Sequence, residues 1–308
     1  MSQPTRPRVV IAGGTGALGR ALAQRLAQAC DVTCVGSRAD AGPGLWRADL
    51  LSVAEAEVAL AGAEVVVFLA RTSGPRARLQ QGSADDVDLL LADSVARAAR
   101  LTKPRRLVFF GCGEQDEREA VLASAGAPLA VLSGGGDDPA AQLEQLVLAP
   151  DVETRRLPGW KGADVSPPAW SGPSTVLSVQ RLSPRAGWTA GQTARAYFEW
   201  LPSAAPGTST VLGAEAYEVK AGGVSVLRLR RVAGQSTDDL EVLEVRDGSL
   251  VSDSSVGAFE FRLLSSPTAL MTTLRGFVPA MPWLLYRASQ APIHARIMRR
   301  FGAWLAAQ

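Results

Sequence analysis

A glycine-rich segment near the amino terminus limits most strongly how this chain can fold. It reads Gly13-Gly14-Thr15-Gly16-Ala17-Leu18-Gly19, follows the apolar run Arg8–Ala12 and precedes a helical repeat of leucines. Glycines permit a tight turn and let backbone N–H groups approach an anion, and the positive end of the following helix dipole faces that anion. A strand, this loop and a helix together predict a nucleotide site that opens a series of alternating strands and helices.

Short apolar runs and helical patterns alternate as far as residue 157. Strands without polar alternation are typical of a parallel sheet that is covered on both faces, and right-handed crossovers make such a sheet doubly wound. We therefore predict a doubly wound parallel α/β domain over residues 1–157. The expected strands are 8–12, 31–36, 45–48, 64–70, 106–110, 129–132 and 152–157, and the expected helices after the first are 53–60, 87–101, 115–125 and 139–148.

The string GGTGALGR after a first strand resembles the short-chain dehydrogenase/reductase superfamily, in particular its extended and atypical NAD-dependent epimerase/dehydratase-like and NmrA-like members. The resemblance covers residues 8–157 and implies a Rossmann domain that binds NAD(P). It also implies that Asp49-Leu50 is the family's acidic–hydrophobic pair at the adenine, and that Ala70-Arg71 lines the cofactor. The glycine-loop residues that it assigns to the cofactor are Gly13, Thr15, Gly16, Ala17, Leu18 and Gly19.

In that family the end of the second strand selects the cofactor. An acidic residue there binds the ribose 2′-hydroxyl of NAD, whereas a basic one accommodates the 2′-phosphate of NADP. This chain has Gly36-Ser37-Arg38, with no acidic residue before Asp40. Because Arg38 can hold a phosphate with two N–H groups, NADP is favoured over NAD. A solvated loop cation is the alternative interpretation of Arg38.

The reductive chemistry of the family depends on a Tyr, on a Lys four residues later, and on a Ser or Thr that ends a central strand. Residues 1–196 contain no Tyr, and Tyr217-x-x-Lys220 has the wrong spacing. Gly111-Cys112-Gly113 stands where the Ser is expected. A free phenol has a pKa near 10 and needs a neighbouring cation to work near neutral pH. The usual acid catalysis is therefore absent from the part of the chain that resembles a reductase.

Other groups at the same sheet edge could carry chemistry. Cys112 follows a predicted strand at the edge where such folds bind ligands, and Glu114 and Asp116 could carry protons if they were desolvated. A small buried cysteine beside the cofactor is the alternative for Cys112. With three Cys and one His in the whole chain, no metal site is expected.

The pattern changes after a Pro-, Gly- and Trp-rich segment at residues 158–173, which is interpreted as a linker. Residues 174–308 predict a smaller α+β domain with an antiparallel sheet and a long C-terminal helix over about 281–307, in which Pro292 marks an N-terminal turn or a kink. This order of elements resembles helix-grip (START-like and polyketide-cyclase-like) domains and implies a ligand-binding domain. The expected elements are strand 175–181, helix 190–201 and strands 214–220, 224–231, 240–246, 250–253, 258–264 and 269–277.

Arginines and aromatic residues interleave in the last forty residues, where no acidic residue follows Glu260. This pattern fits either an amphipathic helix packed on its own domain or a peripheral contact with an anionic membrane. A homodimer is also left open. A net charge of +2 argues against a nucleic-acid partner. The amino terminus shows no signal peptide and the cysteines form no disulfide framework, so a cytoplasmic protein is expected.

Two functions fit these observations. The first is an oxidoreductase or epimerase-like enzyme that depends on NAD(P), lacks the Tyr-Lys pair, and acts on a small carbonyl or apolar substrate. The second is a non-catalytic protein that senses NADP(H) or binds a ligand in a regulatory role.

Overall fold

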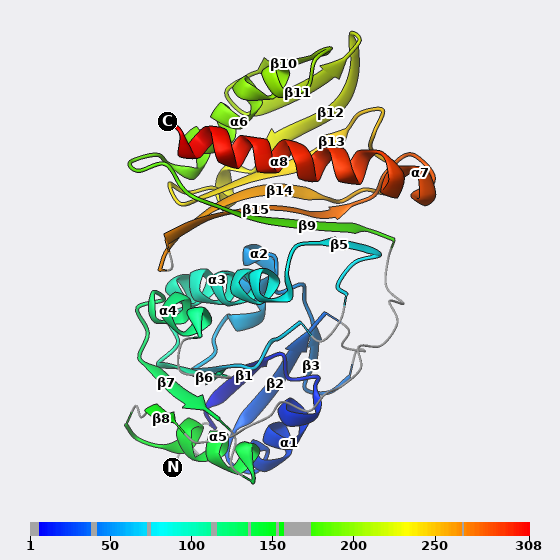
Figure 1. The fold of residues 1–308 in the computed structure, drawn as a ribbon. Coiled ribbons are helices and arrows are strands. Elements are labelled where there is room, and N and C mark those ends of the chain that lie inside the picture. The colour runs from blue at the N-terminus through cyan, green and yellow to red at the C-terminus, as the bar shows by residue number, and fades with distance from the viewer. Residues whose placement is uncertain are drawn as a thin grey trace. The chain divides into compact units, whose positions relative to one another are not determined.

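The computed structural model describes residues 6–37, 42–72, 75–111, 116–134, 137–151, 154–156, 174–266 and 268–308. The chain forms two compact units (Figure 1). Unit 1 contains Met1–Thr72 and Asp88–Val165, and unit 2 contains Ser73–Val87 and Ser166–Gln308. The expected linker at 158–173 lies outside the described residues.

Unit 1 is built on a seven-stranded parallel sheet with the order β3-β2-β1-β4-β6-β7-β8. Its central strands are apolar without alternation, and all four residues of β4 are buried. The strands are β1 (Arg8–Ala12), β2 (Asp31–Gly36), β3 (Leu45–Arg47), β4 (Val65–Phe68), β6 (Arg106–Gly111), β7 (Leu129–Ser133) and β8 (Thr154–Arg156).

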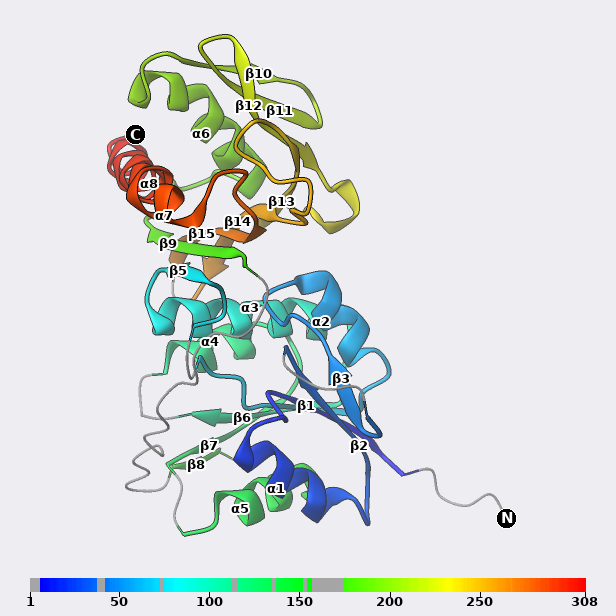
Figure 2. The same cartoon turned by 90° about the vertical axis from the view of Figure 1, so that its right-hand side faces the viewer.

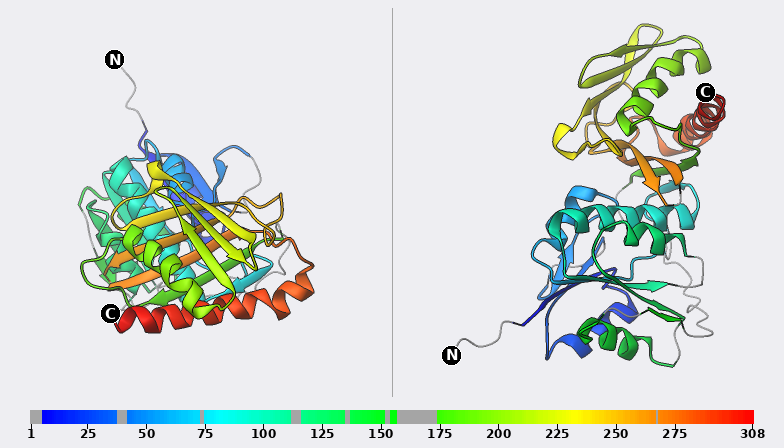
Figure 3. Two further views of the ribbon diagram at one scale, coloured as in Figure 1. Left: turned by 90° about the horizontal axis from the view of Figure 1, so that it is seen from above. Right: turned by 90° about the vertical axis from the view of Figure 1, so that its left-hand side faces the viewer.

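Helices cover both faces of this sheet (Figures 2 and 3). Helices α1 and α5 pack on one face, where Leu22, Leu26, Leu143 and Leu146 join the buried strand residues in one core cluster. Helices α2, α3 and α4 cover the opposite face. The predicted doubly wound parallel architecture is therefore confirmed. The helices are α1 (Ala17–Leu26), α2 (Val53–Leu60), α3 (Ala84–Thr102), α4 (Glu117–Ala123) and α5 (Pro139–Leu148).

The strand order reverses between β1 and β4. From β1 the chain runs outward through β2 and β3, then returns to β4 on the other side of β1 and continues through β6, β7 and β8. Loops that leave neighbouring strands in opposite directions separate at such a point, so open α/β sheets bind ligands there, at the carboxyl ends of the strands. The loop after β1 and the segment after β4 meet at this edge.

Arg106, at the start of β6, holds the carboxyl end of α5. Its side chain is buried, with Nη1 donating to the carbonyl oxygens of Leu146 at 2.7 Å and Ala149 at 2.8 Å, and Nη2 donating to that of Pro150 at 2.9 Å. The last carbonyl groups of a helix have no partner within the helix and carry partial negative charge. One guanidinium therefore supplies donors to several of them.

Unit 2 is built on an eight-stranded sheet with the order β10-β11-β12-β13-β14-β15-β9-β5. All neighbours are antiparallel except β5 and β9, which are parallel. The strands are β5 (Leu79–Gln81), β9 (Val176–Leu182), β10 (Thr208–Leu212), β11 (Ala216–Ala221), β12 (Val224–Arg231), β13 (Leu240–Asp247), β14 (Ala258–Ser265) and β15 (Thr268–Phe277).

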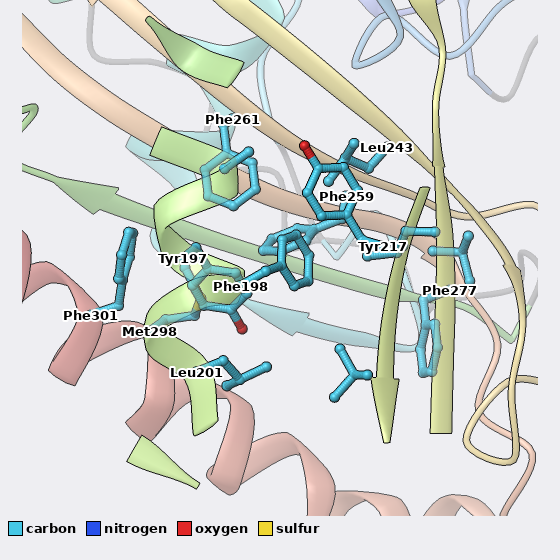
Figure 4. Packing of buried hydrophobic residues seen from close by; sticks show 14 of the residues in the cluster. Tyr197, Phe198, Leu201, Tyr217, Leu243, Phe259, Phe261, Phe277, Met298 and Phe301 are labelled. Carbon is cyan, nitrogen blue, oxygen red and sulfur yellow. The ribbon is translucent and has the colours of Figure 1, made fainter. Parts of the chain in front are cut away.

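Three helices complete unit 2: α6 (Ala190–Ala204), α7 (Trp283–Ala288) and α8 (Gln290–Ala306). A capping box begins α6, in which the Thr189 side chain accepts from the amide of Gln192 and the Gln192 side chain accepts from the amide of Thr189. Aromatic rings pack between α6, α8 and the sheet (Figure 4). The ring of Tyr197 lies 5.5 Å from that of Phe259 and 5.1 Å from that of Phe301, both edge to face.

Unit 2 confirms an α+β domain with an antiparallel sheet and C-terminal helices, but three of its details differ from the prediction. Strands β5 and β10 were not expected. Residues 250–253 form no strand: Val251 makes only an isolated bridge to Pro279, in which the amides of Ser252 and Ala280 donate to the carbonyl oxygens of Val278 and Leu250. The C-terminal helical stretch is divided at Ser289, next to the turn or kink expected at Pro292, since Pro292 in the first turn of α8 cannot donate back to the end of α7.

Candidate functional site

The glycine loop after β1 places three glycines in three different environments. Gly13 has φ +87°, and a Cβ there would lie 2.6 Å from the backbone nitrogen of Ala70. Its own N–H donates to the carbonyl oxygen of Val35 at 2.8 Å. Gly13 therefore joins the ends of β1, β2 and β4, and its positive φ and close packing exclude any larger residue.

Gly19 lies in the first turn of α1 and packs against the loop itself. A Cβ at Gly19 would lie 2.4 Å from the Cα of Gly14, and a Cβ at Gly14 would lie 2.8 Å from the Cβ of Cys34. These contacts bring the amino terminus of α1 against β1 and β2. The close contact between Gly19 and Gly14 therefore holds the amino terminus of α1 against the glycine loop.

Gly16 differs from the other two because no packing contact requires a glycine there. It is exposed and has φ −74°, which any residue can adopt, and the nearest atom to an added Cβ is the carbonyl oxygen of Gly13 at 3.8 Å. Gly16 is the N-cap of α1, where no side chain caps the helix and the first turn has no acidic residue. The end of this helix thus offers backbone donors and an open approach to an anion.

The remaining predicted cofactor residues surround the carboxyl ends of β2, β3 and β4. Ser37 is exposed directly after β2, while Arg38 lies outside the described residues. Leu50 is buried, and the Asp49 amide donates to Glu55 Oε2 at 2.7 Å. Ala70 is buried against Gly13, and the Arg71 side chain is 44% exposed.

A buried ionic cluster lies on the same side of unit 1, after β4 and at the start of α4. Asp88 Oδ1 accepts from the Thr72 amide at 2.5 Å, and its Oδ2 lies 3.7 Å from both Arg71 Nε and Arg118 Nη1. Arg118 also donates to Asp116 at 2.8 Å, and its guanidinium carbon lies 5.2 Å from the centre of a phenylalanine ring. The cluster fixes the backbone that follows Ala70.

Burial raises the pKa of Asp88 above its ordinary value, although the hydrogen bonds from Thr72 and the guanidinium groups of Arg118 and Arg71 oppose the shift. A carboxyl of this kind takes up a proton at a higher pH than an exposed one. Asp88 was not identified from the sequence. The available signal was its position within a helix whose residues 87–99 are all buried, where an acidic side chain needs a partner.

The predicted catalytic residues Cys112 and Glu114 lie outside the described residues. The flanking Asp116 is described, and it caps α4 by accepting from the Arg118 amide. All three Tyr lie in unit 2, in α6, β11 and α7. Within the described ranges, no group of three or more His, Cys, Asp or Glu side chains could hold a metal ion. No helix in this part of the chain is long and apolar enough to cross a bilayer.

Comparisons with known proteins bear on the amino-terminal half and on the whole chain. Residues 9–123 match the model of the NAD dependent epimerase/dehydratase family. The resemblance seen in the glycine loop is thereby confirmed for this segment. The chain is also 22% identical over 312 residues to the auxiliary protein GraX of Staphylococcus aureus, across 96% of this chain and 92% of that protein.

Solved structures with similarity to this chain include a Rossmann-fold NAD(P)-binding family protein from Shigella flexneri. It is 18% identical over 47% of this chain and 88% of that chain, with a TM-score of 0.36. Uronate dehydrogenase from Agrobacterium tumefaciens is 16% identical over 48% of this chain and 74% of that chain, also with a TM-score of 0.36. The resemblance of residues 174–308 to helix-grip domains stays a prediction.

Proposed function

We propose that unit 1 binds a nicotinamide adenine dinucleotide, with the pyrophosphate at the amino terminus of α1. The environment of Gly16 carries this proposal: the residue is a glycine where packing does not demand one, at a helix end with no side-chain cap. A ligand that comes close to the backbone explains both properties. The match of residues 9–123 to the epimerase/dehydratase family supports the same ligand.

The proposed cofactor is NADP. Ser37 and Arg38 follow β2, and no acidic residue stands there to accept a hydrogen bond from the 2′-hydroxyl of NAD. Arg38 would hold the 2′-phosphate. Asp49 and Leu50 would contact the adenine, and Ala70 and Arg71 would line the nicotinamide half.

The proposed activity is that of an oxidoreductase or epimerase-like enzyme on a small carbonyl or apolar substrate. The bound nicotinamide would supply or accept the hydride. The proton must come from a group other than Tyr, since residues 1–196 contain none. Cys112 and Glu114 follow β6 in the sequence, and Asp88 is the described carboxyl on this side of unit 1 whose pKa is raised by burial. These three side chains are the candidates for proton transfer.

A Gly16→Asp variant tests the cofactor site. Aspartate is a better N-cap than glycine and its charge suits the helix dipole, so we expect the free energy of unfolding to stay unchanged or rise by up to about 1 kcal/mol. The same carboxylate would repel a pyrophosphate, so the affinity for NADPH should fall at least about tenfold, or about 1.4 kcal/mol. Gly234→Asp, where an added Cβ meets open space, is the matched control for an added charge.

Calorimetric titration of the purified protein with NADPH, NADP, NADH and NAD gives the affinities. An Arg38→Ala variant should lose about 10- to 100-fold in affinity for NADPH and little for NADH, as expected for losing a charge-assisted hydrogen bond. Unchanged binding by Gly16→Asp, or no binding by the natural protein, contradicts the proposal. NADPH oxidation with a panel of small carbonyl compounds, repeated with Cys112→Ser, Glu114→Gln and Asp88→Asn, then tests the chemistry.

A further inference from the structure

Unit 2 contains a cavity of about 360 Å³ between α6, the first turns of α8 and one face of the sheet. Protein interiors are close-packed and contain few voids larger than a water molecule. A cavity of this size lies within the range of small-molecule sites, at its lower end. Its aromatic lining comes from elements far apart in the sequence: Tyr197 and Phe198 in α6, Phe259 in β14 and Phe277 in β15 (Figure 4). Tyr286 in α7 completes it.

The side chains that line the cavity determine whether a suitable ligand can carry a charge. Among the described residues, no Asp, Glu, Lys or Arg lines the cavity, and most of the lining is aliphatic or aromatic. An ionised group placed there would lose its hydration without gaining a counter-ion, which is strongly unfavourable. The ligand is therefore uncharged and mostly apolar.

One buried polar atom in the lining, His294 Nε2, makes no hydrogen bond with the described part of the chain. His294 lines the cavity, and its ring centre lies 6.3 Å from that of Phe259. Buried polar atoms nearly always have a partner, and leaving one without a partner costs free energy. A ligand in the cavity could supply the partner.

Burial lowers the pKa of His294 to about 4, so its imidazole is neutral near pH 7. A neutral imidazole nitrogen donates or accepts one hydrogen bond, according to its tautomer. It therefore suits a hydroxyl or carbonyl group better than a carboxylate. The cavity also reaches the surface, because Ile293 lines it and is 56% exposed.

We propose that this cavity binds an uncharged, mostly apolar molecule of about the size of two fused rings, whose single hydroxyl or carbonyl group hydrogen-bonds to His294 Nε2. This site is formed within unit 2 and does not depend on dinucleotide binding. Neither the family match over residues 9–123 nor the glycine loop assigns it, and the resemblance of residues 174–308 to helix-grip domains implies a ligand without specifying its polar group or the role of His294.

Three probes of one shape test the proposal: naphthalene, 2-naphthol and 2-naphthoate. Each is titrated into the full-length protein by calorimetry, and the single His of the chain is followed by NMR after histidine-specific ¹⁵N labelling. We expect 2-naphthol to bind about 5- to 50-fold more tightly than naphthalene, in line with one hydrogen bond to an otherwise unsatisfied group. It should shift the Nε2 signal. Naphthoate should bind most weakly because no cation meets its charge.

Two variants separate the hydrogen bond from the cavity. His294→Leu should bind naphthalene and 2-naphthol with similar affinity, and Ala221→Leu, which adds volume to the lining, should weaken both. Gly16→Asp should bind 2-naphthol as the natural protein does, so failure of the cofactor proposal leaves this result intact. Equal affinities of the natural protein for naphthalene and 2-naphthol, a preference for naphthoate, or no binding up to the solubility limit overturns the proposal, even if a variant fails to fold.

Discussion

His294 should make the stability of this protein depend on pH in a way that one substitution removes. It is the only His in the chain, and burial lowers its pKa to about 4, whereas an unfolded chain gives a pKa near 6.5. Between these two pH values the unfolded state binds a proton that the folded state does not. The free energy of unfolding must therefore decrease as the pH falls through this window.

The size of this effect follows from the two pKa values. A difference of about 2.5 units is worth about 3 kcal/mol over the whole window, at 1.36 kcal/mol per unit. Between pH 7.5 and pH 5 the loss should be about 2 kcal/mol. Two buried acids, Asp88 and Glu241, have raised pKa values and contribute with the opposite sign, since their folded forms hold a proton more readily. Their contributions are shared by the natural protein and by a His294 variant, so they cancel in the difference.

Urea unfolding of the natural protein and of His294→Leu at pH 7.5, 6.5, 5.5 and 5.0 measures this difference. The variant should be at least as stable at pH 7.5, because it lacks the unsatisfied Nε2, and its stability should decline by about 2 kcal/mol less on acidification. The NMR signals of the single imidazole give the folded-state pKa directly. A midpoint near 6.5, or parallel stability curves for the two proteins, would refute the account of His294 as a neutral imidazole whose Nε2 is buried.

Two further substitutions test features of unit 1. Arg106→Met keeps the apolar stem but removes the donors to the end of α5, so it should lower the free energy of unfolding by about 2–4 kcal/mol. Arg105 is exposed, and the control variant Arg105→Met should change the free energy of unfolding by less than about 0.5 kcal/mol. Similar urea midpoints for the two variants would contradict the role assigned to Arg106. Gly19→Ala should lower the free energy of unfolding by about 1–3 kcal/mol despite the better helix propensity of alanine, because its Cβ would lie 2.4 Å from the Cα of Gly14. Gly234→Ala is the control, since an added Cβ there meets open space. A higher melting temperature for Gly19→Ala would show that the loop can move to accommodate the methyl group.

The sequence predicts unit 1 well because its signals are local. Strands such as Val65–Phe68 are buried on both faces and therefore uniformly apolar. Ser52 caps the start of α2, and Asp138 caps α5 with Pro139 as its first residue; such N-terminal signals can be recognised without a structure. The glycines of the loop could also be located from their spacing. The reason why each position is a glycine could not be predicted, since the contact of Gly13 with Ala70 and the open space around Gly16 arise only in the folded chain.

Features that depend on distant partners were missed. Leu79–Gln81 carries only one apolar residue, and it is a strand because β9 offers it an edge to pair with. Asp88 is a site residue because Thr72 and Arg118 come to it from other elements. The unpartnered Nε2 of His294 could not be foreseen, because it results from the packing of α8 against α6 and the sheet.

The pairing of β5 with β9 also sets an order of events during synthesis. Gln81 leaves the ribosome 95 residues before Val176, the difference between their positions, and at about 5–20 residues per second this strand waits roughly 5–20 s for its partner. Strands β1, β2 and β4 of unit 1 are already made when β5 appears, and β6, β7 and β8 are made during this interval. A vector that expresses residues 174–308 alone would encode a sheet without this edge strand, and β9 would be left with unpaired backbone groups open to another chain. The two units are therefore not separable by a single cut in the gene.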